Sequence, residues 1–413
     1  MRLQSLIGLF ILVLLAWVFS EHRRRLNLKA IVVGLGLQLV LAIILLKMPG
    51  SQAVFLLLNK VVQALEKATM AGTGFVFGYL GGGPLPFEEK SPGLSYILAF
   101  RGLPLVLVMS ALSSLLFHWR VLPAVVRFFG WMFRRTMSIG GVESLGTAAN
   151  IFVGMVEAPL LVRPYVVDVS RSELFTIMAS GMATIAGTVM VIYATILSDL
   201  IPGIMGHLLT ASIISAPAAV VVAKLMVPET GAPSTGKVEL PRVATSSMDA
   251  ITRGTMSGIQ LLINIVAMLV VLVALVHLCN LILGRLLDLN GEPLTLQALL
   301  GLIMAPVTWL MGIPWEEATI SGSLMGTKTV LNEFLAYVEL SELPRGVLSD
   351  RTRLIITYAM CGFANFGSLG IMIGGMGAMA PERRAEIVQL GLKSIVAGTI
   401  ATCMTGAVVG IVF

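Results

Sequence analysis

The sequence predicts an all-α integral membrane protein. Hydrophobic residues make up 57% of the 413 residues and charged residues only 12%, about half the charged fraction of an ordinary soluble domain. The mean hydropathy is +0.93. The apolar residues gather in stretches that approach or exceed the roughly 20 residues needed to cross a bilayer as a helix. Because no series of alternating, strand-length segments is present, a transmembrane β-barrel is not expected.

Eight stretches are long and apolar enough to be membrane spans. They lie near residues 5 to 20, 31 to 48, 102 to 117, 174 to 198, 206 to 227, 258 to 284, 354 to 376 and 389 to 413. The first stretch is expected to remain as a span, because it lacks a small-residue cleavage site and its main charge cluster follows the apolar run.

The positive charges set the expected orientation. Three arginines at 23–25 follow the first span, which places this loop in the cytoplasm and both chain termini outside it. The arginines at 120–135 and the loop at 228–250 then also fall on the cytoplasmic side. Since this topology accounts for the net charge of +6, no nucleic-acid partner is expected.

Two segments are too polar to cross a membrane easily and too apolar for ordinary loops. Residues 138–163 and 312–340 contain glycines and polar residues throughout, and each is followed by a helix with an interrupted middle, at 180–194 and 358–375. The flanking charges place the two units in opposite orientations, each with a re-entrant hairpin and a broken helix. Such an inverted repeat indicates a secondary transporter, because helix breaks expose backbone groups that bind substrates and ions.

The same pattern divides the chain into four parts. Residues 1–135 hold helices 1 to 3 and an amphipathic interfacial helix at about 51–70. Residues 136–200 hold the first hairpin and its broken helix. Residues 201–290 hold helix 5, a cytoplasmic loop and the long helix 6, and residues 291–413 hold the second hairpin, the broken helix 7 and helix 8.

Polar side chains gather in the interrupted segments. They are Asn150 with Glu157, Thr184 with Thr188, Asn332 with Glu333, and Asn365 with Ser368. Ionisable groups inside a membrane are costly and usually functional, so Glu157 and Glu333 are candidates for ligand contacts. Alternatively, the glutamates cap helices or pair with Arg163 and Lys328, and the amides and hydroxyls only join helices.

Two other classes of protein are possible from composition. A membrane enzyme could use Glu157 and Glu333 as an acid and base pair, and a channel could use the same polar residues to line a pore. Against an enzyme stands the lack of a Ser/His, Cys/His or metal-ligand set among the three cysteines and four histidines. The inverted repeat favours a carrier, without enzymatic activity and without an organic cofactor.

Four stretches resemble the concentrative nucleoside transporter family, in its bacterial members. They are GTGFVFGYLGGG at 72–83, ESLGTAANIFVG with EAPLLVRPY at 143–165, GTKTVLNEFLAY at 326–337 and GFANFGSLGI at 362–371. With the matching order of spans, the resemblance covers nearly the whole chain. It implies a homotrimer in the lipid of the bacterial inner membrane, which imports nucleosides or nucleoside-like solutes with sodium. The hairpins and broken helices form a transport domain that moves like an elevator against a fixed scaffold.

The resemblance also assigns individual residues. The substrate-binding positions are Met155, Val156, Glu157, Val189, Asn332, Glu333, Phe363, Asn365 and Ser368. The sodium ligands are the side chains of Asn150 and Thr184 and the backbone carbonyls of Val153 and Ile185. Within the first set, Glu333, Asn365 and Ser368 hold the ribose hydroxyls, Phe363 contacts the base, and Glu157 lies at the base end. The chemistry agrees, because a carboxylate can accept both hydroxyls of a diol while Asn and Ser supply donors.

One departure from the family concerns the base end of the predicted site. Family members that recognise nucleosides well commonly have Gln and a hydroxyl residue before the hairpin glutamate, and this chain has Met155 and Val156. The loss of hydrogen-bonding side chains leaves the nucleobase preference open. A family member that carries another ribosylated or modified solute, possibly with protons, is the alternative.

Overall fold

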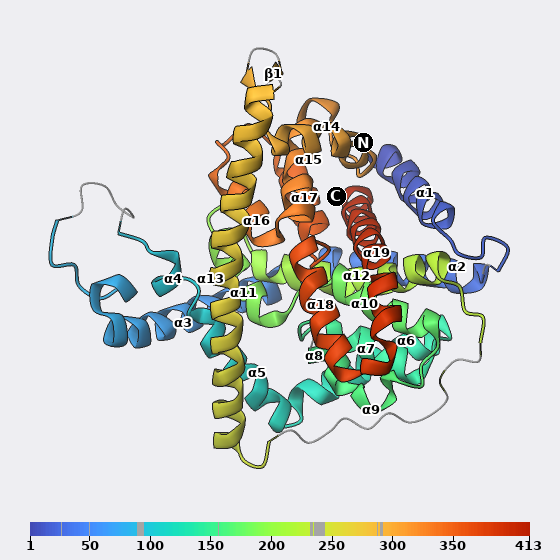
Figure 1. The fold of residues 1–413 in the computed structure, drawn as a ribbon, viewed down its shortest axis with the longest axis horizontal. Coiled ribbons are helices and arrows are strands. Elements are labelled where there is room, and N and C mark those ends of the chain that lie inside the picture. Colours follow the sequence, from blue (N-terminus) through green and yellow to red (C-terminus); the bar gives the residue numbers. More distant parts are fainter. Residues whose placement is uncertain are drawn as a thin grey trace.

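The computed structural model describes residues 1–25, 27–48, 50–88, 95–155, 157–231, 234, 244–286, 288–289 and 292–413. These residues are almost entirely helical (Figure 1). The exception among them is an antiparallel pair of two-residue strands, β1 (Asp288–Leu289) and β2 (Glu292–Pro293). The prediction of an α-helical membrane protein is confirmed.

Six helices in the described part are long and apolar enough to cross a membrane, and a bent pair could supply a seventh span. They are Leu28–Lys47, Leu98–His118, Arg171–Ile196, Ile204–Met226, Ser247–Arg285 and Pro381–Val412. Two of the eight expected spans have a different form. The first is the 17-residue helix α1 (Arg2–Val18), and the one near 354 to 376 is divided into α17 (Asp350–Met360) and α18 (Phe366–Met379).

The N-terminal part contains the expected amphipathic helix, but with a later end. Its helices are α2 (Leu28–Lys47), α3 (Ser51–Phe77), the 3-10 turn η1 (Gly78–Gly81), α4 (Leu98–Arg101), α5 (Leu105–His118) and α6 (Val121–Met137). The expected end near residue 70 is too early, because α3 continues to Phe77. The Thr73 hydroxyl donates to the Gly81 carbonyl at 2.7 Å, and a Cβ at Gly81 would lie 2.2 Å from the Thr73 carbonyl oxygen. Glycine therefore lets η1 fold back onto α3.

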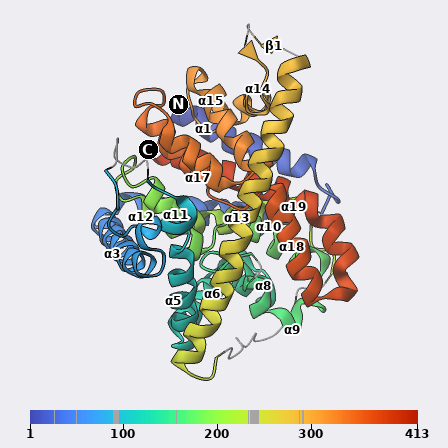
Figure 2. The same ribbon diagram turned by 60° about the vertical axis from the view of Figure 1, so that its left-hand side comes forward.

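Apart from the additional short helix α9 in the first unit, the two predicted units have the same order of elements. The first consists of α7 (Gly141–Asn150), α8 (Glu157–Leu161), α9 (Arg163–Val166), α10 (Arg171–Ala183) and α11 (Gly187–Ile196). The second consists of α15 (Trp315–Val330), α16 (Glu333–Glu342), α17 and α18. In Figure 1, α7 and α8 lie toward the lower end of the molecule and α15 and α16 toward the upper end, and Figure 2 shows α8 and α15 at the same opposite ends. The units therefore approach the centre from opposite ends.

The breaks in the two long helices contact each other. Helix α10 ends at Ala183, and the Thr184 carbonyl accepts a hydrogen bond from the amide of Phe363, in the break after α17, at 3.3 Å. A Cβ at Gly362 would lie 2.9 Å from the Met182 carbonyl oxygen. The missing side chain at Gly362 permits this approach of backbone to backbone. The crossing of the two breaks places unwound chain from both units in one region.

The remaining helices form the buried centre and one exposed wall. They are α12 (Ile204–Met226), α13 (Ser247–Leu286), α14 (Leu296–Leu310), η2 (Pro381–Arg383) and α19 (Arg384–Val412). In the spans that contain α10, α12 and α19, 89%, 89% and 83% of the most apolar window is buried, against 6% in α13. Helix α13 runs from the upper to the lower end of the molecule (Figure 1), and its low burial shows that much of its apolar surface faces outward.

An ionic cluster joins three elements at the predicted cytoplasmic side. Glu21, between α1 and α2, lies 3.0 Å from Arg171 at the start of α10 and 2.5 Å from Lys393 of α19. The hydrogen bond from Arg171 lowers the pKa of Glu21 to about 2. Partial burial of Glu21 opposes this shift, and Lys393 adds to it. The carboxylate is therefore ionised at neutral pH and links these elements.

Candidate functional site

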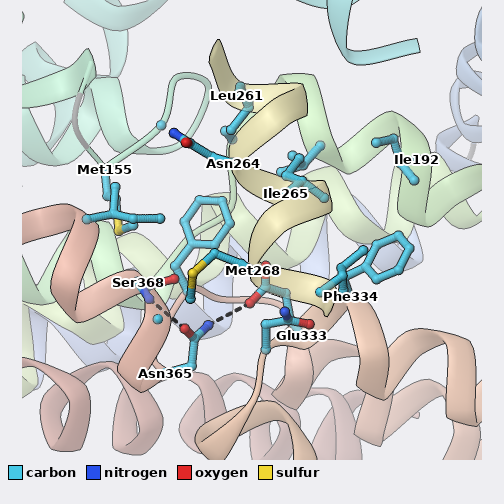
Figure 3. Close-up of a pocket in the computed structure, with 18 of the residues that line it drawn as sticks. Met155, Ile192, Leu261, Asn264, Ile265, Met268, Glu333, Phe334, Asn365 and Ser368 are labelled. Carbon is cyan, nitrogen blue, oxygen red and sulfur yellow. Dashed lines mark hydrogen bonds between the residues drawn. The ribbon is translucent and has the colours of Figure 1, made fainter. Parts of the chain in front are cut away.

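A cavity of about 180 Å³ lies where the two units meet α13 (Figure 3). Eight of the nine predicted substrate residues line it: Met155, Glu157, Val189, Asn332, Glu333, Phe363, Asn365 and Ser368. The ninth, Val156, lies outside the described residues. The structure thus brings together residues as far apart in the chain as Met155 and Ser368.

Glu333 is the centre of the polar part of this cavity. Its Oε1 accepts a hydrogen bond from the Tyr193 hydroxyl at 2.7 Å, and its Oε2 accepts one from Asn365 Nδ2 at 2.8 Å. An ionised carboxylate has about four acceptor positions. After these two bonds, each oxygen keeps about one position for a ligand. Two neighbouring hydroxyl donors on a ligand match that remaining capacity.

The two asparagines of the cavity cap different helices, and Asn365 also binds Glu333. Asn365 Oδ1 accepts from the Ser368 amide at 2.7 Å and caps α18, while its Nδ2 holds Glu333. Asn332 Oδ1 accepts from the Leu335 amide at 2.9 Å and caps α16. Asparagine is a favoured helix cap, so the caps fix both helix starts at the cavity wall. The side-chain oxygens of both asparagines are engaged by helix caps, so each offers a ligand mainly its remaining amide N–H groups.

The other end of the cavity is formed by the first hairpin. Glu157 begins α8, and its side chain folds over Gly154, where an added Cβ would lie 2.1 Å from Glu157 Oε2. A second cavity of about 210 Å³ continues from here and shares Gly154, Glu157 and Thr188 with the first. It is also lined by His118 and Arg253, near the loops predicted to be cytoplasmic. The end of the first hairpin therefore lies between the two cavities and forms part of the wall of each.

The four predicted sodium ligands lie beside the cavity and not in its wall. Asn150 and Thr184 are both 1% exposed. Asn150 Nδ2 donates to the Ile177 carbonyl at 3.2 Å, while its Oδ1 has no hydrogen-bond partner among the described residues. The Thr184 hydroxyl donates to the Ser180 carbonyl at 2.8 Å, which leaves its oxygen able to accept.

An orphaned buried oxygen is costly unless something fills its coordination. Amide, hydroxyl and carbonyl oxygens, as supplied by Asn150, Thr184, Val153 and Ile185, suit a hard cation. Among the described residues, no cluster of three His, Cys, Asp or Glu side chains forms a site for a softer metal. The residues present fit a sodium ion.

Several lining residues were missed by the sequence analysis. Tyr193 of α11 binds Glu333, and α13 contributes Leu261, Asn264, Ile265 and Met268 to the cavity wall (Figure 3). Two signals were present in the sequence: a phenol inside the first broken helix and the amide of Asn264 inside the apolar run of α13. The aliphatic residues of α13 carried no signal, because every span contains such residues.

Comparison with known proteins assigns the chain to a family. Family models described as the C-terminus and N-terminus of Na⁺ dependent nucleoside transporters match residues 207–410 and 7–80, and one described as nucleoside recognition matches residues 99–200. The chain belongs to the concentrative nucleoside transporter family. It is therefore a membrane transporter and not an enzyme.

Members of this family resemble the chain over its whole length. Nucleoside permease NupC of Helicobacter pylori is 33% identical and is matched over 98% of this chain and 97% of its own length. An uncharacterized transporter, YutK of Bacillus subtilis, is 38% identical over 99% and 98%.

The solved structures of CNTnw in an inward-facing, substrate-bound state and, as a variant, in an outward-facing state give TM-scores of 0.91 and 0.90. Their sequence identities are 35% and 34%, and they match 100% of this chain and 98% and 97% of their own.

Proposed function

We propose that the protein is a symporter that couples the inward movement of sodium to the import of nucleosides or nucleoside-like solutes. The observation that carries the proposal is the arrangement of Glu333, with one open acceptor position on each oxygen at a cavity wall. This capacity suits the vicinal hydroxyls of a ribose. Asn365 and Ser368 complete the ribose end, and the family relationship supports the same class of solute.

Sodium coupling is supported by the buried amide oxygen of Asn150. A cation at Asn150 and Thr184, with the carbonyls of Val153 and Ile185, would satisfy this oxygen and add positive charge near the helix breaks. One sodium ion moving down a membrane potential contributes about 2.3 kcal/mol per 100 mV in addition to its concentration gradient. In this proposal, binding of the sodium ion also orders the first hairpin.

The movement that delivers the substrate is an elevator motion. In this proposal residues 136–200 and 291–413 form the transport domain, and the helices of 1–135 and 201–290 form the scaffold. Solved CNTnw structures of nearly equal similarity are described as inward- and outward-facing, which supports two positions of one fold. The exposed apolar surface of α13 supports contacts between scaffold and lipid or between subunits of a homotrimer in the bacterial inner membrane. Both termini lie outside the cytoplasm.

The base end distinguishes this chain within the family proposal. Met155 and Val189 present apolar surface to the cavity, so Glu157 and Thr188 supply the polar contacts there. A thioether is adaptable and makes little directional hydrogen bonding. This supports the second candidate, a nucleoside-like solute with a less polar group in place of a standard base.

Uptake into proteoliposomes tests the proposal. With sodium outside, labelled nucleoside should accumulate saturably and above its external concentration, and replacing sodium by choline should abolish accumulation. Free ribose and free base should compete poorly, because each fills only one end of the cavity. Non-saturable equilibration would indicate a channel, and undiminished uptake in choline with a proton gradient would overturn sodium coupling. Failure of all nucleosides to compete would overturn the substrate class.

A further inference from the structure

Lys328 is a cation that the family relationship leaves unexplained. It lies in the last turn of α15 and is 0% exposed. Its Nζ has no hydrogen-bond partner among the described residues. A buried ammonium without bonds is unfavourable unless a nearby charge offsets its desolvation. Packing alone would be satisfied by a neutral side chain of similar length.

The charge near Lys328 is the carboxylate of the ribose end. Lys328 lies in the last turn of α15, and Glu333 begins α16 directly after the short break between these two helices. Both side chains are buried, and their charges attract each other. Lys328 itself does not line the cavity, and the hydrogen bonds of Glu333 come from Tyr193 and Asn365. Lys328 therefore acts on a substrate only through the field it exerts on Glu333.

The corresponding place in the first unit contains the opposite kind of group. There, Asn150 ends α7 near the break after α10, and its buried Oδ1 accepts no hydrogen bond from the part of the chain that the structure describes. In the second unit, Lys328 lies in the last turn of α15 near the break after α17, where Cys361 follows the helix. The first unit thus offers an acceptor oxygen to a cation. The second unit already contains a cation, the ammonium group of Lys328.

We infer that Lys328 is a tethered cation. In the second unit it takes the place that a bound sodium ion takes in the first, and its positive charge offsets that of the Glu333 carboxylate, the acceptor for substrate. The inference rests on the proposed function for its sodium part. It makes Lys328 a positioning residue for binding. It also implies one sodium ion per substrate, because a second ion beside Glu333 would face a fixed positive charge.

The first experiment needs no substrate. Thermal unfolding of the detergent-solubilised protein is compared for Lys328→Met, Glu333→Gln and the double variant, with Thr327→Val as a control at the adjacent buried position. Lys328→Met leaves a buried carboxylate uncompensated, so we expect a large fall in Tm that the double variant partly recovers. Additive shifts would overturn the coupling of the two charges.

The second experiment measures binding and sodium dependence. Lys328→Ala should bind a ribonucleoside at least about 10-fold more weakly than Thr327→Val, and added methylammonium, a small cation that fits the deleted end of the side chain, should recover much of the loss. Wild type should have a sodium Hill coefficient of one. Equal binding by Lys328→Ala and Thr327→Val, or a loss that methylammonium leaves unchanged, would overturn the role of the charge. A wild-type coefficient of two would overturn the stoichiometry.

The two experiments separate the two proposals. If wild-type protein showed no sodium-coupled nucleoside uptake, the proposed function and the stoichiometry would fail together. The thermal cycle would still decide whether Lys328 compensates the charge of Glu333.

Discussion

Replacing Glu333 by glutamine removes a charge while keeping the shape of the site. The amide can place its Oε1 against Asn365 Nδ2 and its Nε2 against the Tyr193 hydroxyl, which can accept as well as donate. The hydrogen-bond network survives, so we expect a folded protein, although the loss of the charge that offsets Lys328 should lower its Tm. One of the two acceptor positions open to a ribose is then replaced by an N–H donor, and the other belongs to a neutral oxygen.

The size of the effect follows from these bonds. Hydrogen bonds to charged groups contribute about 1.5–3 kcal/mol and neutral ones about 0.5–1.5 kcal/mol. Losing one charged bond and weakening the second should cost about 2 to 3 kcal/mol, or roughly a 30- to 150-fold weaker Kd. The loss should be nearly absent for a 2′,3′-dideoxynucleoside, which offers no diol to Glu333.

Equilibrium binding of labelled ribonucleoside and dideoxynucleoside to wild type and Glu333→Gln measures this difference. Glu339→Gln is a matched control, because this carboxylate lies on the same helix, α16, and does not line the cavity. It should bind both ligands as wild type does. Equal losses for the two ligands in Glu333→Gln, or no loss for the ribonucleoside, would refute the assignment of Glu333 to the ribose.

Three further predictions test other parts of the reasoning. Asn150→Ala should weaken sodium activation of uptake at least about 10-fold, since it removes the orphaned oxygen; wild-type sodium curves would contradict the ion site. Met155→Gln with Val156→Thr should sharpen base selectivity by about 1 to 2 kcal/mol, measured by competition among nucleosides, and an unchanged profile would mean that the base is recognised elsewhere. An impermeant thiol reagent applied outside should label Glu88→Cys and not Thr230→Cys, both exposed loop positions, in a background without the exposed native cysteine; the reverse pattern would invert the topology.

Much of the candidate site was predictable because its signals are local. Glu157, Glu333 and Asn365 stand out as polar groups in otherwise apolar segments, and the motifs around them resemble a family. The end of α3 was mispredicted for an equally local reason. Glycines usually indicate a loop, and only the close approach of Gly81 to Thr73 explains why the chain stays helical to Phe77.

The sequence by itself determined the class of the protein, its broken helices and the residues that could hold a diol and an ion, because hydropathy and buried polar groups are properties of short segments. Only the tertiary structure decided that Tyr193 and Asn365 bind opposite oxygens of Glu333, that α13 closes the cavity, and that Lys328 is buried behind it. These contacts join positions as far apart as 140 residues. They depend on how two breaks cross in space, which no local pattern specifies.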